Sequence, residues 1–220
     1  MSFPQWNEIL TQRLRLRPLT LEDAPDVYAL RSFEEVYRWS VRPKWLSLSE
    51  AEEWIGQRLE RPQNFQYCAE LLDPSMVDPS TPKVIATMGV VGSQELGYQF
   101  HPATWGKGIA TEAVSAFVKE LSRHPDLVDM NKLEAWVAEE NKGSQRVLEK
   151  VGFLRKEERV VQDGGDEEKV ELSHEELAEL RKSVEAMNLP TKGEISPIRP
   201  RRMIKLIIFE IDKTKLGTQS

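Results

Sequence analysis

Apolar residues follow two different periods along this chain, and each period predicts a different kind of element. Apolar residues three or four positions apart predict helices over 20–31, 47–61, 111–123 and 142–151. The stretch 32–48, between the first two helices, is expected to be irregular. Alternation of apolar and polar residues, or a short unbroken apolar run, predicts strands over 13–17, 65–72, 83–91, 95–100, 132–137, 154–162 and 202–211.

The order of these elements excludes a strictly alternating fold. One strand and two helices come first, three consecutive strands follow, and strand and helix alternate only after them. A doubly wound sheet would alternate strand and helix throughout. The sequence therefore predicts an α/β (α+β) fold with a mixed sheet, in a single domain that spans 1–220. An insertion at 163–200, with an amphipathic helix in its middle, precedes the last strand.

The composition is that of a soluble globular protein. Of 220 residues, 40% are hydrophobic and 30% are charged, which excludes a disordered tail or a fibre. No apolar run approaches the roughly 20 residues of a membrane helix, and the first ten residues lack the features of a secretory signal. One cysteine, Cys68, cannot form an intrachain disulfide or a thiolate metal cluster. We therefore expect a cytoplasmic protein with no metal and no membrane partner.

The formal net charge of −6 is concentrated in one segment. Residues 163–180 hold eight acidic side chains and one lysine, a charge of −7, so the rest of the chain carries +1. Arg13, Arg15 and Arg17 alternate with leucines, as on the solvent face of a strand. Nucleic-acid binders concentrate positive charge on one face, so no nucleic-acid partner is expected. The acidic segment is either a solvated helix or a source of attraction for a cationic substrate.

A glycine-rich loop between a predicted strand and a predicted helix is the first candidate site. Gly106 and Gly108 allow backbone conformations closed to other residues, and the helix behind them offers unpaired N–H groups and the positive end of its dipole. Such a loop suits a phosphate or pyrophosphate group, although a tight turn before a helix would also explain it. The Walker pattern is absent, and the dinucleotide fingerprint fails at Thr111, where it needs Gly or Ala.

Two motifs resemble those of the GCN5-related N-acetyltransferases. The loop at 105–110 resembles the family pattern Gln/Arg-x-x-Gly-x-Gly/Ala, with tryptophan at the first position. A second motif, Asn-x-x-Ser at 141–144, leads to Gly-Phe at 152–153. Both motifs, together with Leu-Gly-Tyr at 96–98, look like the branch of ribosomal-protein-alanine and spermidine acetyltransferases. The resemblance covers roughly 12–162 and the last strand.

The resemblance implies a mostly antiparallel central sheet with helices on both faces and a V-shaped split. The split would open between the fourth and fifth predicted strands, at a bulge in the fourth. Acetyl-CoA would be the co-substrate, and backbone groups of Gln99, Phe100 and His101 would pair with its pantetheine arm. Asn141 would orient that arm or the sulfur. The pyrophosphate would lie on the loop residues Trp105, Gly106, Lys107, Gly108, Ile109, Ala110 and Thr111.

The implied reaction is direct attack of a primary amine on the thioester in a ternary complex. The pKa of an alkylammonium, ~10.4, lies ~3.4 units above pH 7, so freeing the lone pair costs ~4.6 kcal/mol. Glu95 is the first candidate for the base and Glu134 the second, although either could be an exposed strand carboxylate. The family's usual acid is a tyrosine four residues before Gly-Phe, where this chain has Leu148. Ser144 is the candidate acid in its place; alternatively, it caps the helix.

Other functions stay open at this point. A non-catalytic CoA-binding regulatory domain would keep the loop and lose the acid and base, as Leu148 in the tyrosine position allows. A dinucleotide-dependent oxidoreductase is the third hypothesis. The acceptor is expected to be a small-molecule amine or a protein N-terminus, and the protein a monomer or a homodimer. Aromatic residues at 33–45 lie where the family's connector faces the acceptor, although core packing would also explain them.

Overall fold

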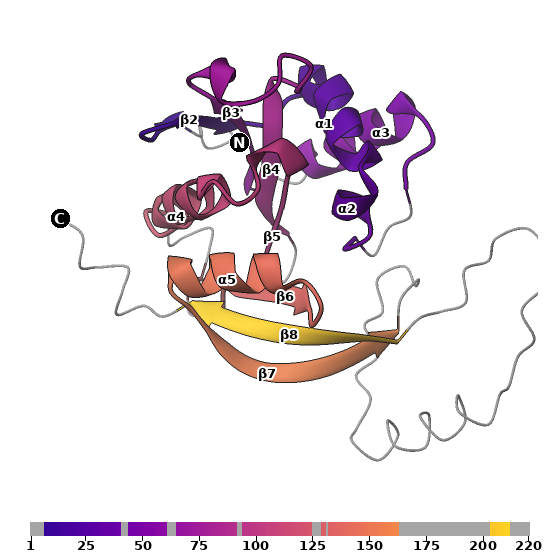
Figure 1. Cartoon of the computed structure of the whole chain (residues 1–220). Helices are drawn as coiled ribbons and strands as arrows, with labels where there is room; N and C mark the ends of the chain where they lie inside the picture. Colours follow the sequence, from indigo (N-terminus) through magenta and orange to yellow (C-terminus); the bar gives the residue numbers. More distant parts are fainter. Residues whose placement is uncertain are drawn as a thin grey trace, which may run out of the picture.

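The computed structural model describes residues 7–40, 44–60, 65–91, 94–124, 129–130, 132–162 and 203–211. The acidic insertion at 163–200 lies outside this part of the chain, so its helix stays a prediction. The described residues are arranged around one eight-stranded sheet (Figure 1).

The sheet is mixed and mostly antiparallel, as predicted. Its strand order is β1-β2-β3-β4-β5-β6-β8-β7, and every neighbouring pair is antiparallel except β5 and β6, which run parallel. All seven predicted strands form, with ends within two residues of those expected. The strands are β1 (Ile9–Leu10), β2 (Leu14–Pro18), β3 (Phe65–Leu71), β4 (Val84–Val91), β5 (Glu95–Phe100), β6 (Glu134–Ala138), β7 (Phe153–Gln162) and β8 (Met203–Ile211).

All four predicted helices also form, and one short helix lies in the stretch expected to be irregular. That helix, α2, has a single turn, and β1 has two residues, so neither is long enough to show a period in the sequence. Short 3-10 turns precede α1 (η1), follow β3 (η2) and follow β5 (η3). The elements are η1 (Leu21–Asp23), α1 (Ala24–Ser32), α2 (Glu34–Tyr37), α3 (Leu48–Leu59), η2 (Pro74–Met76), η3 (Pro102–Thr104), α4 (Ile109–Leu121) and α5 (Lys142–Val151).

Helices cover both faces of the sheet, and β3 shows how. Phe65, Tyr67 and Ala69 belong to a core cluster with residues of α4 and α5, whereas Cys68 belongs to a second cluster with residues of α1 and α3. This division follows from the alternation of side chains along a strand. In Figure 1, α4 lies to the left of β4 and β5, and α1, α2 and α3 lie to their right. The predicted two-sided covering is confirmed.

The sheet opens between β5 and β6. These parallel strands share a single register pair, Glu95 with Glu134, and Glu134 N donates to Gln94 O at 3.1 Å. Beyond that pair β5 and β6 diverge, whereas β5 is paired with β4 along the whole length of β5. The V-shaped split is therefore confirmed between the fourth and fifth predicted strands. Register shifts occur in the β3–β4 and β7–β8 pairings, and none interrupts the β4–β5 pairing, so the bulge expected in β5 is not found there.

Candidate active site

The loop between β5 and α4 presents a row of main-chain N–H groups. Gly106 (φ +73°) and Gly108 (φ +74°) adopt left-handed backbone conformations, which residues with a Cβ rarely adopt. Gly108 is the N-cap of α4, and no side chain caps the helix. Within the described part of the chain, no group accepts a hydrogen bond from the amides of 106–111. These N–H groups lie at the positive end of the α4 dipole and can bind an anion.

Arg13, which precedes β2, forms an ion pair with Glu112 of α4 and also binds the loop backbone. Arg13 Nε donates to Glu112 Oε2 at 2.6 Å, and Arg13 Nη1 donates to Lys107 O at 2.8 Å. Glu112 also accepts from Thr11 Oγ1 at 2.6 Å. Burial would raise the pKa of the Glu112 carboxyl, but the hydrogen bonds from Thr11 and Arg13 outweigh burial and lower the pKa. The carboxylate stays ionised, and Arg13 balances its charge beside the anion-binding loop.

Two loop side chains fasten the loop to neighbouring segments. Lys107 Nζ donates to Met76 O in η2 at 2.9 Å, and Trp105 Nε1 donates to Phe100 O at 2.9 Å. The indole therefore occupies the last carbonyl of β5. Trp105 is 46% exposed, so part of its ring stays open to a ligand at the wide end of the split.

The free edge of β5 differs in one respect from the prediction. His101 N donates to Ile85 O at 2.8 Å, and His101 O accepts from the η3 turn, so the backbone of His101 is engaged within the protein. Backbone groups alternate sides along an antiparallel strand. Gln99 therefore also faces β4, while Tyr98 and Phe100 face the split. Of the three residues predicted to pair with pantetheine, only Phe100 presents a backbone group to it, its N–H, because the Phe100 carbonyl already accepts from the Trp105 indole.

The aromatic connector after α1 is divided between the site and the core. The Phe33 ring meets the His101 ring edge to face, with centroids 4.7 Å apart, and burial lowers the pKa of the His101 imidazole. Trp45 is buried in the α1–α3 cluster, 5.6 Å from the Trp54 ring. Phe33 therefore lies at the end of β5, beside the site, whereas Trp45 serves the core.

Asn141 is the N-cap of α5, and Ser144 lies in the first turn of this helix. Asn141 Oδ1 accepts from Ser144 N at 3.1 Å. The Ser144 hydroxyl is thus left for another partner, and it donates to the Tyr98 hydroxyl oxygen at 2.7 Å. The Tyr98 hydroxyl in turn donates to Ser144 O at 3.1 Å. Burial raises the pKa of the Tyr98 phenol, so it stays protonated at neutral pH.

Leu148 stands where the family usually has its catalytic tyrosine, and it offers no hydroxyl there. Its side chain is fully buried in the core cluster of α4 and α5. Among the described residues, the hydroxyls of Ser144 and Tyr98 are the pair that joins α5 to β5 across the split.

The two candidate bases lie on the opposite face of the sheet from Ser144. Leu96, the residue after Glu95 in β5, points into the α4–α5 core, so Glu95 points away from it, and its register partner Glu134 shares that face. Glu134 accepts from Trp136 Nε1 at 3.1 Å and lies 3.5 Å from Lys156 Nζ. The carboxylates of Glu95 and Glu134 therefore lie on one face of the sheet beside the split, and the Ser144 hydroxyl lies on the other face.

Cys68 is not a candidate nucleophile. Its thiol is buried, and burial together with the nearby Asp23 carboxylate raises its pKa to about 12, so the reactive thiolate is scarce at neutral pH. No group of three or more His, Cys, Asp or Glu side chains in the described residues could hold a metal ion. In that same part of the chain, no helix has the length and apolarity to cross a membrane.

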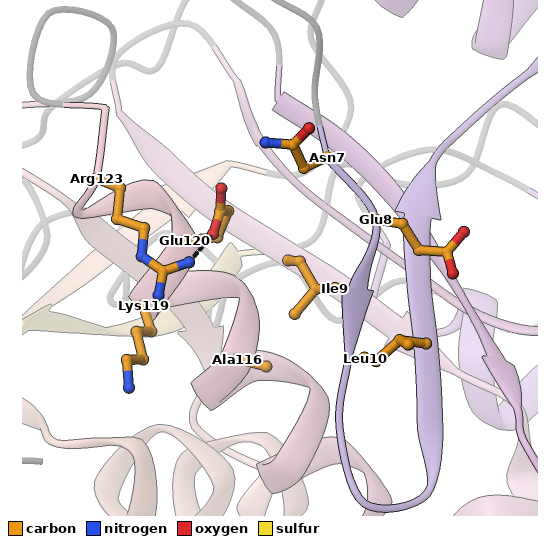
Figure 2. A pocket seen from close by; sticks show the side chains of 8 residues that line it. All are labelled: Asn7, Glu8, Ile9, Leu10, Ala116, Lys119, Glu120 and Arg123. Carbon is orange, nitrogen blue, oxygen red and sulfur yellow. Dashed lines mark hydrogen bonds and ion pairs between the residues drawn. The ribbon is translucent and has the colours of Figure 1, made fainter. Parts of the chain in front are cut away.

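A cavity of about 380 Å³ lies away from this site (Figure 2). Its walls come from β1 and the preceding residues and from the C-terminal half of α4, where Arg123 pairs with Glu120 at 2.7 Å. The anion-binding loop lies at the other end of α4. The cavity therefore contributes no group to the split.

Known proteins are similar to this chain in sequence and in fold. Residues 13–154 match the family model described as acetyltransferase (GNAT) domain. The chain belongs to this family, and it is an acetyl-CoA-dependent N-acetyltransferase. The family resemblance seen in the sequence is confirmed.

Individual N-acetyltransferases are similar to this chain in sequence or in fold. A curated relative from Bacillus licheniformis, N-acetyltransferase p20, is 28% identical over 153 residues, which cover 67% of this chain and 82% of the relative. The fold is similar to that of a GNAT-family acetyltransferase from Bacillus anthracis (TM-score 0.60, 16% identity, 92% of this chain and 96% of that one). It is also similar to a spermidine N-acetyltransferase from Vibrio cholerae solved with CoA and spermine (TM-score 0.59, 16% identity, 94% and 99%).

Proposed function

We propose that this chain moves the acetyl group of acetyl-CoA to a primary amine by direct attack within a ternary complex. The observation that carries the proposal is the split between β5 and β6. Unpaired amides lie at its loop end, Ser144 lies on one face of the sheet, and Glu95 lies on the other. The acetyl donor and the amine can then approach the split from different sides.

The binding part of the proposal starts at the loop. The amides of 106–111 bind the diphosphate of acetyl-CoA, and each hydrogen bond to a charged group contributes ~1.5–3 kcal/mol. The backbone N–H and C=O of Tyr98 and the backbone N–H of Phe100, whose carbonyl is taken by Trp105, pair with the pantetheine arm. Asn141 uses its side-chain oxygen to cap α5, so its amide N–H₂ is the part that can orient the arm.

The chemical part needs a base, an oxyanion site and a partner for the thiolate. Glu95, or Glu134 beside it, accepts the proton of the ammonium directly or through water. An N–H group of β5 stabilises the oxygen of the thioester carbonyl as negative charge develops on it. Ser144 donates a hydrogen bond to the leaving thiolate, whose ordinary pKa is ~8.5. None of these steps uses Cys68.

A thiol-release screen tests the proposal. Acetyl-CoA is incubated with spermidine, spermine, amino acids, drug-like amines and peptides with free N-termini, and the free CoA thiol is measured. We expect turnover with at least one amine, acetylation of that amine by mass spectrometry, and sequential kinetics with intersecting double-reciprocal lines. Parallel lines would contradict direct attack. CoA binding without thiol release from any amine would favour the non-catalytic regulatory domain, in agreement with Leu148.

The same assay identifies the base. Glu95→Gln, which removes the proposed base, is expected to lower kcat/KM about 100-fold at pH 7. The loss should shrink as the pH rises toward the pKa of the amine, because the free amine then forms without help. Glu134→Gln is the matched variant in the paired strand, and a larger loss there would assign the base to Glu134.

A further inference from the structure

The Tyr98 hydroxyl is joined to Ser144 by two hydrogen bonds across the split. The hydroxyl oxygens are 2.7 Å apart, and the phenol also reaches the Ser144 carbonyl at 3.1 Å. Tyr98 belongs to β5 and Ser144 to the first turn of α5, 46 residues later in the chain. The pair therefore connects the two elements that diverge around the site.

Both partners are fixed by other contacts. The Tyr98 ring packs edge to face against Phe100, with centroids 5.9 Å apart, and lies against the α4–α5 core. Ser144 N is held by the Asn141 cap at 3.1 Å. Since Asn141 already caps the helix, the Ser144 hydroxyl has no capping role, and its place beside Tyr98 needs another explanation.

The chemistry of two hydroxyls gives that explanation. Each can donate or accept, and each hydrogen can rotate about its C–O bond. In the structure Ser144 Oγ donates to Tyr98, and Tyr98 donates to the Ser144 carbonyl. If the Ser144 hydrogen turns toward a sulfur in the split, the Tyr98 hydrogen can turn to Ser144 Oγ at the same distance. A hydroxyl that accepts one hydrogen bond donates a stronger one.

We propose that Tyr98 is a positioning residue that holds Ser144 and strengthens its hydrogen bond to the leaving thiolate of CoA. The proposal rests on the proposed function, in which Ser144 faces that sulfur. As the amine nitrogen bonds to the carbonyl carbon, the C–S bond breaks and its electron pair goes to sulfur. Ser144 then donates to sulfur and Tyr98 to Ser144 Oγ. Both hydroxyls keep their protons. The acetylated nitrogen releases its extra proton to water, and the thiolate takes one proton from water, so the step balances.

The ionisation of bound CoA tests this without an amine. The thiolate absorbs in the ultraviolet, so the thiol of CoA on the protein is titrated against a blank with desulfo-CoA, which lacks the sulfur. We expect the thiolate-to-thiol ratio at a given pH to be about tenfold higher on the wild-type protein than on Tyr98→Phe, a pKa difference of about one unit. Ser144→Ala should lose the effect too, and Tyr98→Phe/Ser144→Ala should lose no more than Ser144→Ala.

Two further variants keep the test specific. Tyr67→Phe is the matched control, because Tyr67 is also buried and its hydroxyl donates to Asn7 O at 2.8 Å, away from the split; it should titrate like the wild type. Fluorotyrosine at position 98 keeps the shape of the residue and makes the phenol a stronger donor, so it should raise the thiolate fraction further. A purely structural role for Tyr98 would not produce these opposite shifts.

The outcomes separate this inference from the proposed function. Wild-type titration equal to that of free CoA, or equal titration of wild type and Tyr98→Phe, overturns the role of Tyr98 and leaves acetyl transfer intact. Additive losses in the double variant also overturn it, because the two hydroxyls would then act independently. Failure of the wild type to bind CoA overturns both proposals together. Should Tyr98→Phe fold poorly, the fluorotyrosine variant alone decides, and an unchanged titration contradicts the role.

Discussion

Backbone conformation at Gly106 and Gly108 decides whether the amides of 106–111 point toward a common ligand. Both residues are left-handed, and the Cβ of an alanine at 108 would meet only Arg13 Nη2, at an ordinary contact distance of 3.5 Å. Space therefore permits a side chain at 108, and the backbone conformation opposes it. This makes 108 a place where affinity for the anion can be changed without a steric clash.

Gly108→Ala is expected to raise the Kd for acetyl-CoA about tenfold. A residue with a Cβ destabilises the left-handed conformation by ~1–2 kcal/mol, and relaxing this strain turns loop amides away from the diphosphate. Isothermal titration calorimetry measures the change. Gly56→Ala on α3 is the control, because nothing lies within 4 Å of its Cβ and alanine is favoured in a helix by ~0.5–1 kcal/mol. It should raise the free energy of unfolding and leave affinity unchanged; equal affinities for both variants would contradict the loop's role.

Arg13→Ala is also expected to raise the Kd for acetyl-CoA, by about tenfold. The variant loses the hydrogen bond to Lys107 O and leaves Glu112 unbalanced beside the diphosphate, and one charged interaction of this kind contributes ~1.5–3 kcal/mol. Arg15→Ala is the matched control, since Arg15 pairs with Glu8 at 2.6 Å, away from the loop. Similar losses in both variants would point to a general effect of charge.

These residues show where prediction from sequence ends. The motifs identified Ser144, Asn141 and the loop glycines, because local chemistry and spacing are visible in the chain. Arg13 pairs with a glutamate 99 residues away, and the alternation that placed it on a solvent face contains no sign of that partner. The Tyr98–Ser144 pair depends on which strands and helices become neighbours, which only the folded chain defines.

At the scale of elements, the carboxylate of Asp23, which ends η1 and precedes α1, also binds the sheet. Asp23 accepts from Thr20 N at 2.8 Å, which closes a capping box, and from Arg17 Nη2 of β2 at 2.6 Å. Burial would raise the pKa of Asp23, but the hydrogen bonds from Arg17 and Thr20 outweigh it and lower the pKa. The charged form therefore stabilises the fold.

Asp23→Asn is expected to lower the free energy of unfolding by ~2 kcal/mol at pH 7, because Arg17 loses a charged partner. The folded-state pKa lies below the ordinary 3.8, so the wild-type advantage is fully present above that value and disappears as the pH falls through the folded-state pKa. Urea unfolding of both proteins at pH 7 and at pH 3 measures the two differences. Asp78→Asn, at an exposed turn carboxylate that accepts from Ser80, should change stability little; an undiminished Asp23 effect at pH 3 would contradict the assignment.

The elements themselves were largely predictable. Helix α5 begins and ends where the sequence places it, because Asn141 caps its start and Gly152, at φ +104°, ends it. Helix α4 starts at Ile109, two residues earlier than predicted, because the left-handed Gly108 already serves as its N-cap. Among the α-helices and strands, α2, with one turn, and β1, with two residues, are too short for periodicity to predict.

At the scale of the whole molecule, the split divides the sheet into two parts. Strands β1–β5 form one part and β6, β8 and β7 form the other, and a single register pair, Glu95 with Glu134, joins them through the sheet. Contacts between α4 and α5 and the Tyr98–Ser144 pair join the parts on one face. A ligand in the split therefore adds contacts to both parts at a place where one register pair links the described strands.

Acetyl-CoA is consequently expected to stabilise the fold and to protect amides on both sides of the split. Ligand at 100 times its Kd adds ~2.7 kcal/mol to the free energy of unfolding, so the Tm should rise with the logarithm of the concentration. Hydrogen–deuterium exchange should slow at the loop 106–111, at β5 and at the start of α5. Strand β1, which lines the cavity away from the split, is the internal reference, and its exchange rate should stay unchanged. A rise in Tm without protection of 106–111 would contradict binding of the diphosphate by those amides, which have no partner among the described residues.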